Sequence, residues 1–157
     1  MRVIDMHTHI FPEKVTEKAT VATAEYFDLP EPPNHYGTVA ELETVLREAG
    51  IDYAMVFSAA TSAHQVEHIN RYIVSEAEKG PRFIPCGTLH AEYENYKEEL
   101  RWLRDHGVHG VKIHPEFQHF TLDDARMFLM YEEMEKNDMF LIAHMLSLIH
   151  ISEPTRH

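Results

Sequence analysis

Hydrophobic and polar positions along the chain follow two alternating periods. Short apolar runs of strand length fall at residues 3–10, 51–58, 82–90, 108–115 and 139–145. Between these runs, apolar residues recur every three or four positions, which is typical of amphipathic helices. A regular alternation of strand and helix predicts an α/β protein in which right-handed crossovers connect parallel strands.

The expected helices have end signals that set their bounds. We expect helices at residues 13–26, 38–49, 62–79, 93–106 and 121–136. Three of them begin with a Ser or Thr followed three positions later by an acidic or amide residue, the pattern of a capping box: Thr38 with Glu41, Ser62 with Gln65 and Thr121 with Asp124. Gly50 and Asn137 are expected to take left-handed conformations at helix ends. The proline-rich stretch 29–37 is expected to be a loop.

The first apolar run, VIDMHTHI, contains a pattern that suits metal binding. Side chains of a strand alternate between its faces, so Asp5, His7 and His9 are expected on one face. The apolar positions around them are expected on the other, buried face. The two imidazoles would lie about 7 Å apart along the strand, close enough for their nitrogens to converge on one ion.

Histidines also end the later strands, and this distribution bears on the architecture. Four strand ends carry one: His9, His90, His114 and His144. The Gly-rich phosphate loop of an open nucleotide-binding sheet is absent after the first strand. Active sites of strand-helix barrels are built from several strands at their carboxyl ends. We therefore expect a partial TIM (β/α)8 barrel of about five parallel strands rather than an open doubly wound sheet.

The run GVKIHP places Lys112 and His114 on one face of the fourth strand. These two are our candidate catalytic residues, either in contact with the substrate or supporting a metal ligand. In the fifth strand, FLIAH, the same alternation puts His144 on the face of Phe140 and Ile142. Beside a His-x-His strand, His144 is expected to be a metal ligand rather than a core histidine.

Composition and charge narrow the classes of partner. Hydrophobic residues make up 44% and charged residues 25% of the chain, as in globular proteins. The net charge of -12 excludes nucleic acid and anionic membranes as partners through bulk electrostatics. A single cysteine, Cys86, allows no internal disulfide, and no signal peptide is recognised. We expect a cytoplasmic protein whose partner is a small-molecule substrate.

Five segments together resemble the amidohydrolase superfamily: IDMHTHIFP, QVEHIN, GTLHAEY, GVHGVKIHPEFQ and FLIAH. The resemblance is stronger to the amidohydrolase-related branch, which includes aminocarboxymuconate-semialdehyde decarboxylase and resorcylate decarboxylase. It implies a divalent metal, usually zinc, held at the barrel mouth by His7, His9 and His144. The full-length parent is expected to be a metal-dependent enzyme, with a homo-oligomer as one expected form.

Two reactions fit this apparatus, and the sequence does not separate them. One is hydrolysis of a C–N or C–O bond by a metal-activated water. The other is non-oxidative decarboxylation of an unsaturated or aromatic carboxylic acid. A phosphoesterase that also opens with a His-x-His strand is disfavoured by the Lys112-x-His114-Pro115 sequence and by the absence of that family's later acidic ligands. A catalytically inert fragment is a further alternative.

The chain divides into an expected barrel portion, residues 1–145, and an expected non-native tail, residues 146–157. The tail continues from the fifth strand without a turn, although a barrel strand ends in a loop and helix at this point. Its sequence LSLIHISEPTR resembles a translated sequencing adapter. The family's further histidine of strand six and aspartate of strand eight have no counterpart here, so we expect a truncated barrel.

Overall fold

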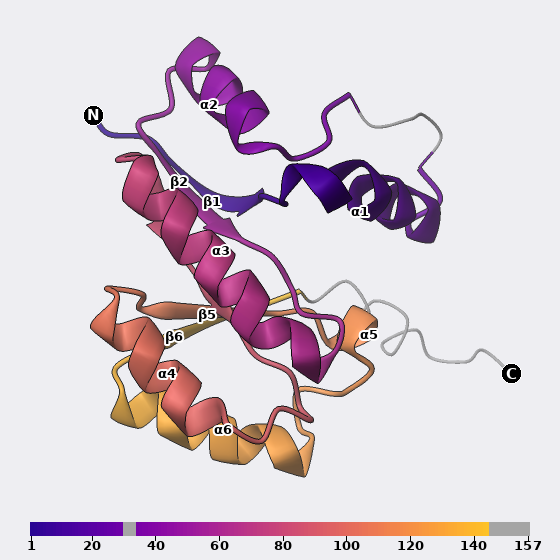
Figure 1. The fold of residues 1–157 in the computed structure, drawn as a ribbon, viewed down its shortest axis with the longest axis vertical. Coiled ribbons are helices and arrows are strands. Elements are labelled where there is room, and N and C mark those ends of the chain that lie inside the picture. Colours follow the sequence, from indigo (N-terminus) through magenta and orange to yellow (C-terminus); the bar gives the residue numbers. More distant parts are fainter. Residues whose placement is uncertain (30–33, 145–157) are drawn as a thin grey trace, which may run out of the picture. The chain divides into compact units, whose positions relative to one another are not determined.

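The computed structural model describes residues 1–29 and 34–144, which form two compact units (Figure 1). The first unit comprises residues 1–58 and 70–86, and the second comprises residues 59–69 with the described residues from 87 onward. The tail expected at residues 146–157 lies outside the described residues. Part of the expected loop at 29–37 does as well.

The first unit is built on a parallel sheet with the strand order β1-β2-β3. Its strands are β1 (Ile4–His9), β2 (Tyr53–Phe57) and β3 (Phe83–Pro85). Its helices are α1 (Glu13–Tyr26), α2 (Val39–Glu48) and most of α3 (Val66–Lys79), of which residues 66–69 belong to the second unit.

The second unit is built on another parallel sheet, with the order β4-β5-β6. Its strands are β4 (Gly87–Thr88), β5 (Gly110–Ile113) and β6 (Phe140–Ala143). Its helices are the 3-10 turn η1 (Ala63–Gln65), α4 (Tyr96–Asp105), α5 (Pro115–Gln118) and α6 (Ala125–Lys136). All strand pairs in both sheets are parallel, which confirms the predicted α/β class.

The third expected strand, residues 82–90, is two short strands that meet at Cys86. β3 pairs with β2, and β4 pairs with β5. Pro85 lacks a backbone N–H and cannot donate to a sheet. The N–H of Cys86 still reaches the Val56 carbonyl at 3.0 Å, after which the chain leaves the first sheet. The expectation of one continuous strand is therefore wrong.

The first strand contains an irregularity that strict alternation of side chains does not predict. β1 advances from Asp5 to Thr8 while β2 advances only from Ala54 to Val56, so β1 bulges between these pairs. The apolar face expected to be buried is largely open, with Met6 55% exposed. The cause is that β1 is an edge strand of its sheet, and a bulge breaks strict alternation.

Helix ends follow the sequence signals in α2. The Thr38 side chain accepts the N–H of Glu41, and the Glu41 carboxylate accepts the N–H of Thr38, so the capping box is confirmed. Gly50 takes the expected left-handed conformation with a φ of 67°. At the end of α6 the expectation is wrong by one residue, because Asp138 and not Asn137 has a positive φ.

Two other expected caps are wrong. Ser62 makes no capping hydrogen bond, and the Gln65 side chain instead accepts the N–H and hydroxyl of Thr61. Helix α6 begins later than expected, at Ala125, and its N-terminal cap is Asp124. Both helices form through their apolar faces despite these differences, as most helices in proteins do.

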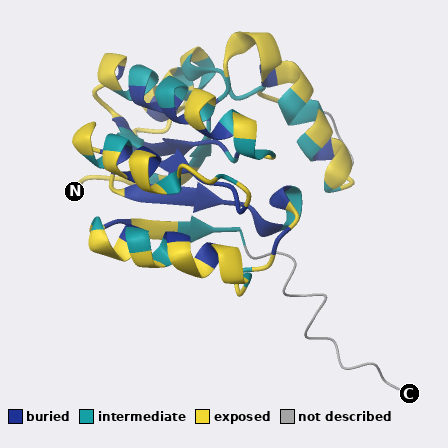
Figure 2. Ribbon diagram, turned by 60° about the horizontal axis from the view of Figure 1, so that its bottom comes forward, coloured by how far each residue is buried: buried dark blue, intermediate teal, exposed yellow. Residues whose placement is uncertain are grey.

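The interior strands carry the core of each unit (Figure 2). Residues Ala54 to Phe57 of β2 and all of β5 are buried, whereas β6 is exposed over its first half. Continuous burial, as in β2 and β5, is expected for strands that are covered on both faces. None of the helices in the described ranges is long and apolar enough to cross a membrane.

Candidate metal and substrate site

The expected pair of imidazoles, His7 and His9, lies side by side at the carboxyl end of β1 in the first unit. Their ring centroids are 5.4 Å apart with a tilt of 47°. Both rings pack edge-on against Phe57 of β2, with centroids at 5.1 and 4.9 Å. The bulge in β1 therefore does not separate the two rings, because one aromatic side chain positions both.

This arrangement fits two positions of a tetrahedral zinc site. Zinc lies about 2.0–2.1 Å from a histidine nitrogen, which places the centroids of two tetrahedrally arranged rings about 5 Å apart. Neighbouring Asp5 accepts the backbone N–H of His7 through its Oδ1 at 3.0 Å. Neither unit by itself brings together three possible metal ligands among the described residues. The third expected ligand, His144, belongs to the second unit, so the three-histidine site stays a prediction.

In the second unit, His114 and His144 stack face to face. Their centroids are 4.1 Å apart with an interplanar angle of 11°. Phe117 stacks on His114 with a centroid distance of 4.0 Å. The backbone of His144 is fixed by an N–H to the Ile113 carbonyl at 3.2 Å. The stack thus orients the ring of the expected metal ligand.

Both stacked histidines are neutral at neutral pH. Burial, followed by electrostatic interaction with His144 and Lys112, lowers the pKa of His114 to about 4. Burial and then the charge of Lys112 also lower the pKa of His144. The Nδ1 atom of His114 accepts the N–H of Phe117 at 3.4 Å, so the proton of the neutral ring lies on Nε2. Neutral imidazole is the form that binds metal ions.

Lys112 places a positive charge in the interior of the same unit. Its side chain extends from β5 and is fully buried. Buried ammonium groups are rare unless they serve a partner or a ligand. The structure brings Lys112, His114 and His144 together in one unit, whereas His7 and His9 lie in the other.

Gln118 is a site residue that the sequence analysis missed. Its Oε1 accepts the N–H of His114 at 2.6 Å. Its Nε2 donates to the carbonyls of Ala60 and Leu89, both at 2.7 Å. The side chain is 2% exposed and joins the segments that follow β2, β4 and β5. The only sequence signal is its position four residues after His114, on the short helix α5.

A small pocket of about 160 Å³ lies beside Gln118 in the second unit. Its wall includes His90, which the sequence analysis noted as a strand-end histidine, and Arg126, which it did not. Burial is the main cause that lowers the pKa of His90, so this ring is neutral as well. Gln118, which lines the pocket, is hydrogen-bonded to the backbone of His114, so the pocket and the candidate site share this residue.

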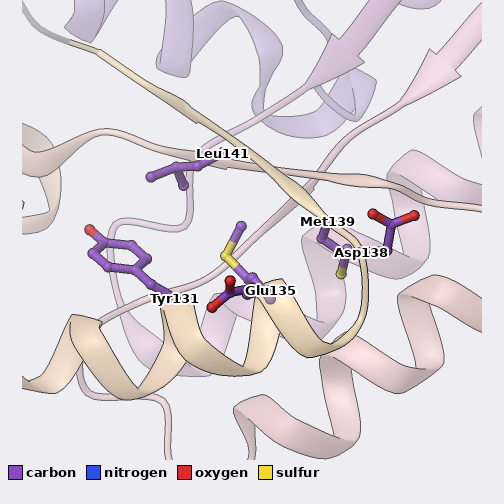
Figure 3. A pocket seen from close by; sticks show the side chains of 6 residues that line it. Tyr131, Glu135, Asp138, Met139 and Leu141 are labelled. Atoms are coloured by element: carbon purple, nitrogen blue, oxygen red, sulfur yellow. The ribbon is translucent and has the colours of Figure 1, made fainter.

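A larger groove of about 330 Å³ lies between α6 and β6 (Figure 3). Met139 precedes β6 and Leu141 lies within it, so the groove lies toward the amino end of the strand. Tyr131 lines it with a buried hydroxyl that makes no hydrogen bond to a described residue, and burial raises the pKa of this phenol. Active sites of strand-helix barrels lie at the carboxyl ends, so this groove is not the candidate site.

Comparison with known proteins gives a family and several structural neighbours. The sequence pattern of the Amidohydrolase family matches residues 4–157. Comparison with the curated proteins gives no match. Among solved structures, the chain is similar to the apo IDCase of Metarhizium anisopliae, with a TM-score of 0.69, 16% identity and coverage of 91% of this chain and 50% of that one.

Two further solved structures have comparable similarity. One is a probable 2-pyrone-4,6-dicarboxylic acid hydrolase of Acinetobacter baumannii with bound citric acid (TM-score 0.61, 17% identity, 92% of this chain and 50% of that one). The other is a dihydroxybenzoic acid decarboxylase of Polaromonas sp. JS666 with bound manganese and the inhibitor 2-nitroresorcinol (TM-score 0.64, 14% identity, 96% and 53%).

These similarities establish the fold and its extent. They confirm a partial TIM barrel, as the strand pattern and the strand-end histidines predict. The chain spans about half the length of the solved chains that it matches. At 14–17% identity the likeness shows the fold alone, so the activity has to be argued from the residues of the site.

Proposed function

Because the chain belongs to the amidohydrolase family, we propose that its protein is a metal-dependent hydrolase. It acts on a C–N or C–O bond of a small organic substrate that carries a carboxylate. The observation that carries the proposal is the fully buried ammonium of Lys112 beside two neutral imidazoles at the carboxyl end of β5. A preformed positive charge in such a position favours an anionic substrate.

His7, His9 and His144 are the proposed metal ligands, and zinc is the proposed ion. The spacing of the first two rings supports this choice, as does the neutral state of His144. When bound, the ion would activate a water and polarise the bond to be broken. The manganese in the dihydroxybenzoic acid decarboxylase makes Mn²⁺ the second ion to test.

The chain's own residues have separate roles in this proposal. The Lys112 ammonium attracts the anionic substrate and stabilises negative charge that develops at the bond to be broken. His114 presents a proton on Nε2, because its Nδ1 is engaged by the N–H of Phe117. The stack of His114 on His144 fixes the ring plane of the proposed ligand.

Non-oxidative decarboxylation is the second candidate reaction. The solved structures that the chain resembles include a dihydroxybenzoic acid decarboxylase, whose substrate is an aromatic acid. A buried cation would also stabilise the negative charge that develops on the substrate as carbon dioxide leaves. Lys112 therefore supports both reactions, and the products distinguish them.

The test is to strip the protein with a chelator, restore it with zinc or manganese, and assay three substrate groups. These are carboxylated amides and lactones, hydroxylated benzoic acids, and phosphate esters. We expect metal-dependent turnover of a carboxylated substrate, and we expect Lys112→Met to lose about tenfold or more in kcat/KM. Lys136→Met, an exposed control on α6, should leave turnover unchanged. Activity confined to phosphate esters would overturn the proposal.

A further inference from the structure

The 160 Å³ pocket of the second unit is lined by residues that follow strands in the chain together with the first turn of α6. Its lining residues are Thr61, Ser62, His90, Ala91, Glu92, Gln118, His119 and Arg126. Gln118 connects the pocket to the candidate site through the N–H of His114. A pocket of this size is smaller than the usual 300–1,000 Å³ of a whole-ligand site, so it suits one functional group of a larger molecule.

His90 offers the pocket a hydrogen-bond donor. The residue is 6% exposed, and its Nδ1 accepts the N–H of Glu92 at 3.2 Å. The proton of the neutral ring therefore lies on Nε2. This Nε2 makes no hydrogen bond to any residue within the described ranges. Among the described residues nothing accepts this donor, so a ligand or water in the pocket can do so.

Ser62 provides a second donor in the same wall. Its Oγ is buried and has no hydrogen-bond partner in the described part of the chain. The sequence pattern suggested that this hydroxyl caps a helix, but it makes no capping contact. Ser62 and His90 thus both line the pocket. Neither the Ser62 hydroxyl nor the His90 Nε2 has a hydrogen-bond partner among the described residues.

Arg126 is held in a defined orientation at the rim. Its Nε and Nη2 donate to the carboxylate of Asp124 at 3.0 and 2.6 Å. Its remaining nitrogen, Nη1, lies 3.7 Å from the Oε1 of Glu92, which is beyond hydrogen-bond length. The Glu92 side chain is 68% exposed, so it is a weakly held carboxylate near an available cation.

We infer that this pocket binds the carboxylate of the substrate, with Glu92 taking that group's place near Arg126 when no ligand is bound. One carboxylate oxygen accepts from His90 Nε2 and the other from Ser62 Oγ, while Arg126 Nη1 supplies charge. The inference rests on the proposed function, since it names the residues that recognise its carboxylated substrate. The effect of removing the Glu92 charge on ligand binding is decisive. An anionic ligand competes with this carboxylate and should bind more tightly without it, whereas a cationic ligand would bind more weakly.

The test uses the full chain without metal and benzoate as the probe. Binding is measured by calorimetry. The histidine rings are observed in a long-range nitrogen-proton NMR spectrum. We expect the His90 Nε2 resonance to move on adding benzoate and not on adding benzyl alcohol, which has the ring but no charge. We expect Ser62→Ala to weaken benzoate binding by about fivefold or more, the size of one hydrogen bond.

Glu92→Gln is expected to strengthen benzoate binding, because it removes the competing carboxylate while keeping the shape. His68→Asn, an exposed change on α3, is the matched control and should alter neither binding nor the His90 resonance. Weaker binding in Glu92→Gln, or an unmoved His90 resonance at saturation, would overturn the inference. Benzoate binding at His90 without metal-dependent turnover would support the subsite and contradict the proposed function; turnover without that binding would do the reverse.

Discussion

The side chain of Gln118 holds three backbone groups around the candidate site. Its amide satisfies one N–H and two carbonyls from three different segments, and it is 2% exposed. Each buried backbone group left without a partner costs about 1–3 kcal/mol. The side chain therefore acts on His114 by position rather than through chemistry of its own.

Gln118→Glu is predicted to destabilise the protein by about 2–4 kcal/mol, because a carboxylate cannot donate to the Ala60 and Leu89 carbonyls. Chemical unfolding followed by circular dichroism measures the difference. The matched control is Gln65→Glu, since Gln65 uses only its Oε1, as an acceptor from Thr61. Equal effects of the two variants would show that the network around Gln118 is unimportant.

The candidate site residues that the sequence predicts lie in short motifs. His7 and His9 are two positions apart in the first strand, and Lys112 and His114 are two apart at the end of another, so the strand period predicts that each pair lies together. In β1, which bulges, the shared contact with Phe57 also holds the pair. Gln118 and Ser62 could not be identified in this way. Their importance comes from which backbone groups and pockets they meet in the folded chain, and no local pattern records that.

At the scale of elements, α2 shows how a local signal fixes a boundary. The hydrogen bonds from the backbone and the hydroxyl of Thr38 are the largest causes that hold the pKa of Glu41 below its ordinary value of 4.5. The two residues form the capping box that begins the helix. A carboxylate whose pKa is lowered in the folded state stabilises it above the unfolded pKa, and this contribution is lost as the pH falls.

Glu41→Gln is accordingly predicted to lower the free energy of unfolding at pH 7. Below pH 4.5 the difference from the unmutated chain should shrink, because Glu41 is then itself protonated. Unfolding curves at pH 7, 5 and 3.5 measure this. Thr38→Ala, which removes the cap, should cost about 1 kcal/mol at pH 7. If the difference in unfolding free energy between the unmutated chain and Glu41→Gln does not depend on pH, the proposed role of this carboxylate in the cap is contradicted.

Where the sequence predicts an element wrongly, the cause is a contact made only in the folded chain. Residues 82–90 have the composition of one strand, but their two halves find different partners on either side of Cys86. The short helix α5 was not expected, because four residues give too little periodicity to detect. In contrast, α1 has the predicted bounds of residues 13–26, since its apolar spacing continues through the whole element.

At the scale of the whole molecule, β6 is a strand with exposed apolar side chains. It lies at the edge of the second sheet, and Phe140 and Leu141 are 45% and 38% exposed. An edge strand with exposed apolar side chains and unpaired backbone groups invites pairing with other chains. We therefore expect the chain to associate at high concentration.

Leu141→Lys is predicted to reduce this association, because a charged side chain on an edge strand opposes pairing. Light scattering across a concentration series measures the change. Phe128→Lys is the matched control: Phe128 is 52% exposed but lies on a helix, α6, and not on a strand. If both variants reduce association equally, general surface hydrophobicity and not the strand edge is responsible.

We propose that His7, His9 and His144 bind one metal ion. Zinc titration by calorimetry, with cobalt absorption to report coordination geometry, tests it directly on the chain and on His7→Ala, His9→Ala, His144→Ala and the exposed control His68→Ala. We expect one ion per chain, and at least about tenfold weaker binding in each of the three ligand variants but not in the control. Zinc affinity and a cobalt spectrum that His144→Ala leaves unchanged would contradict it.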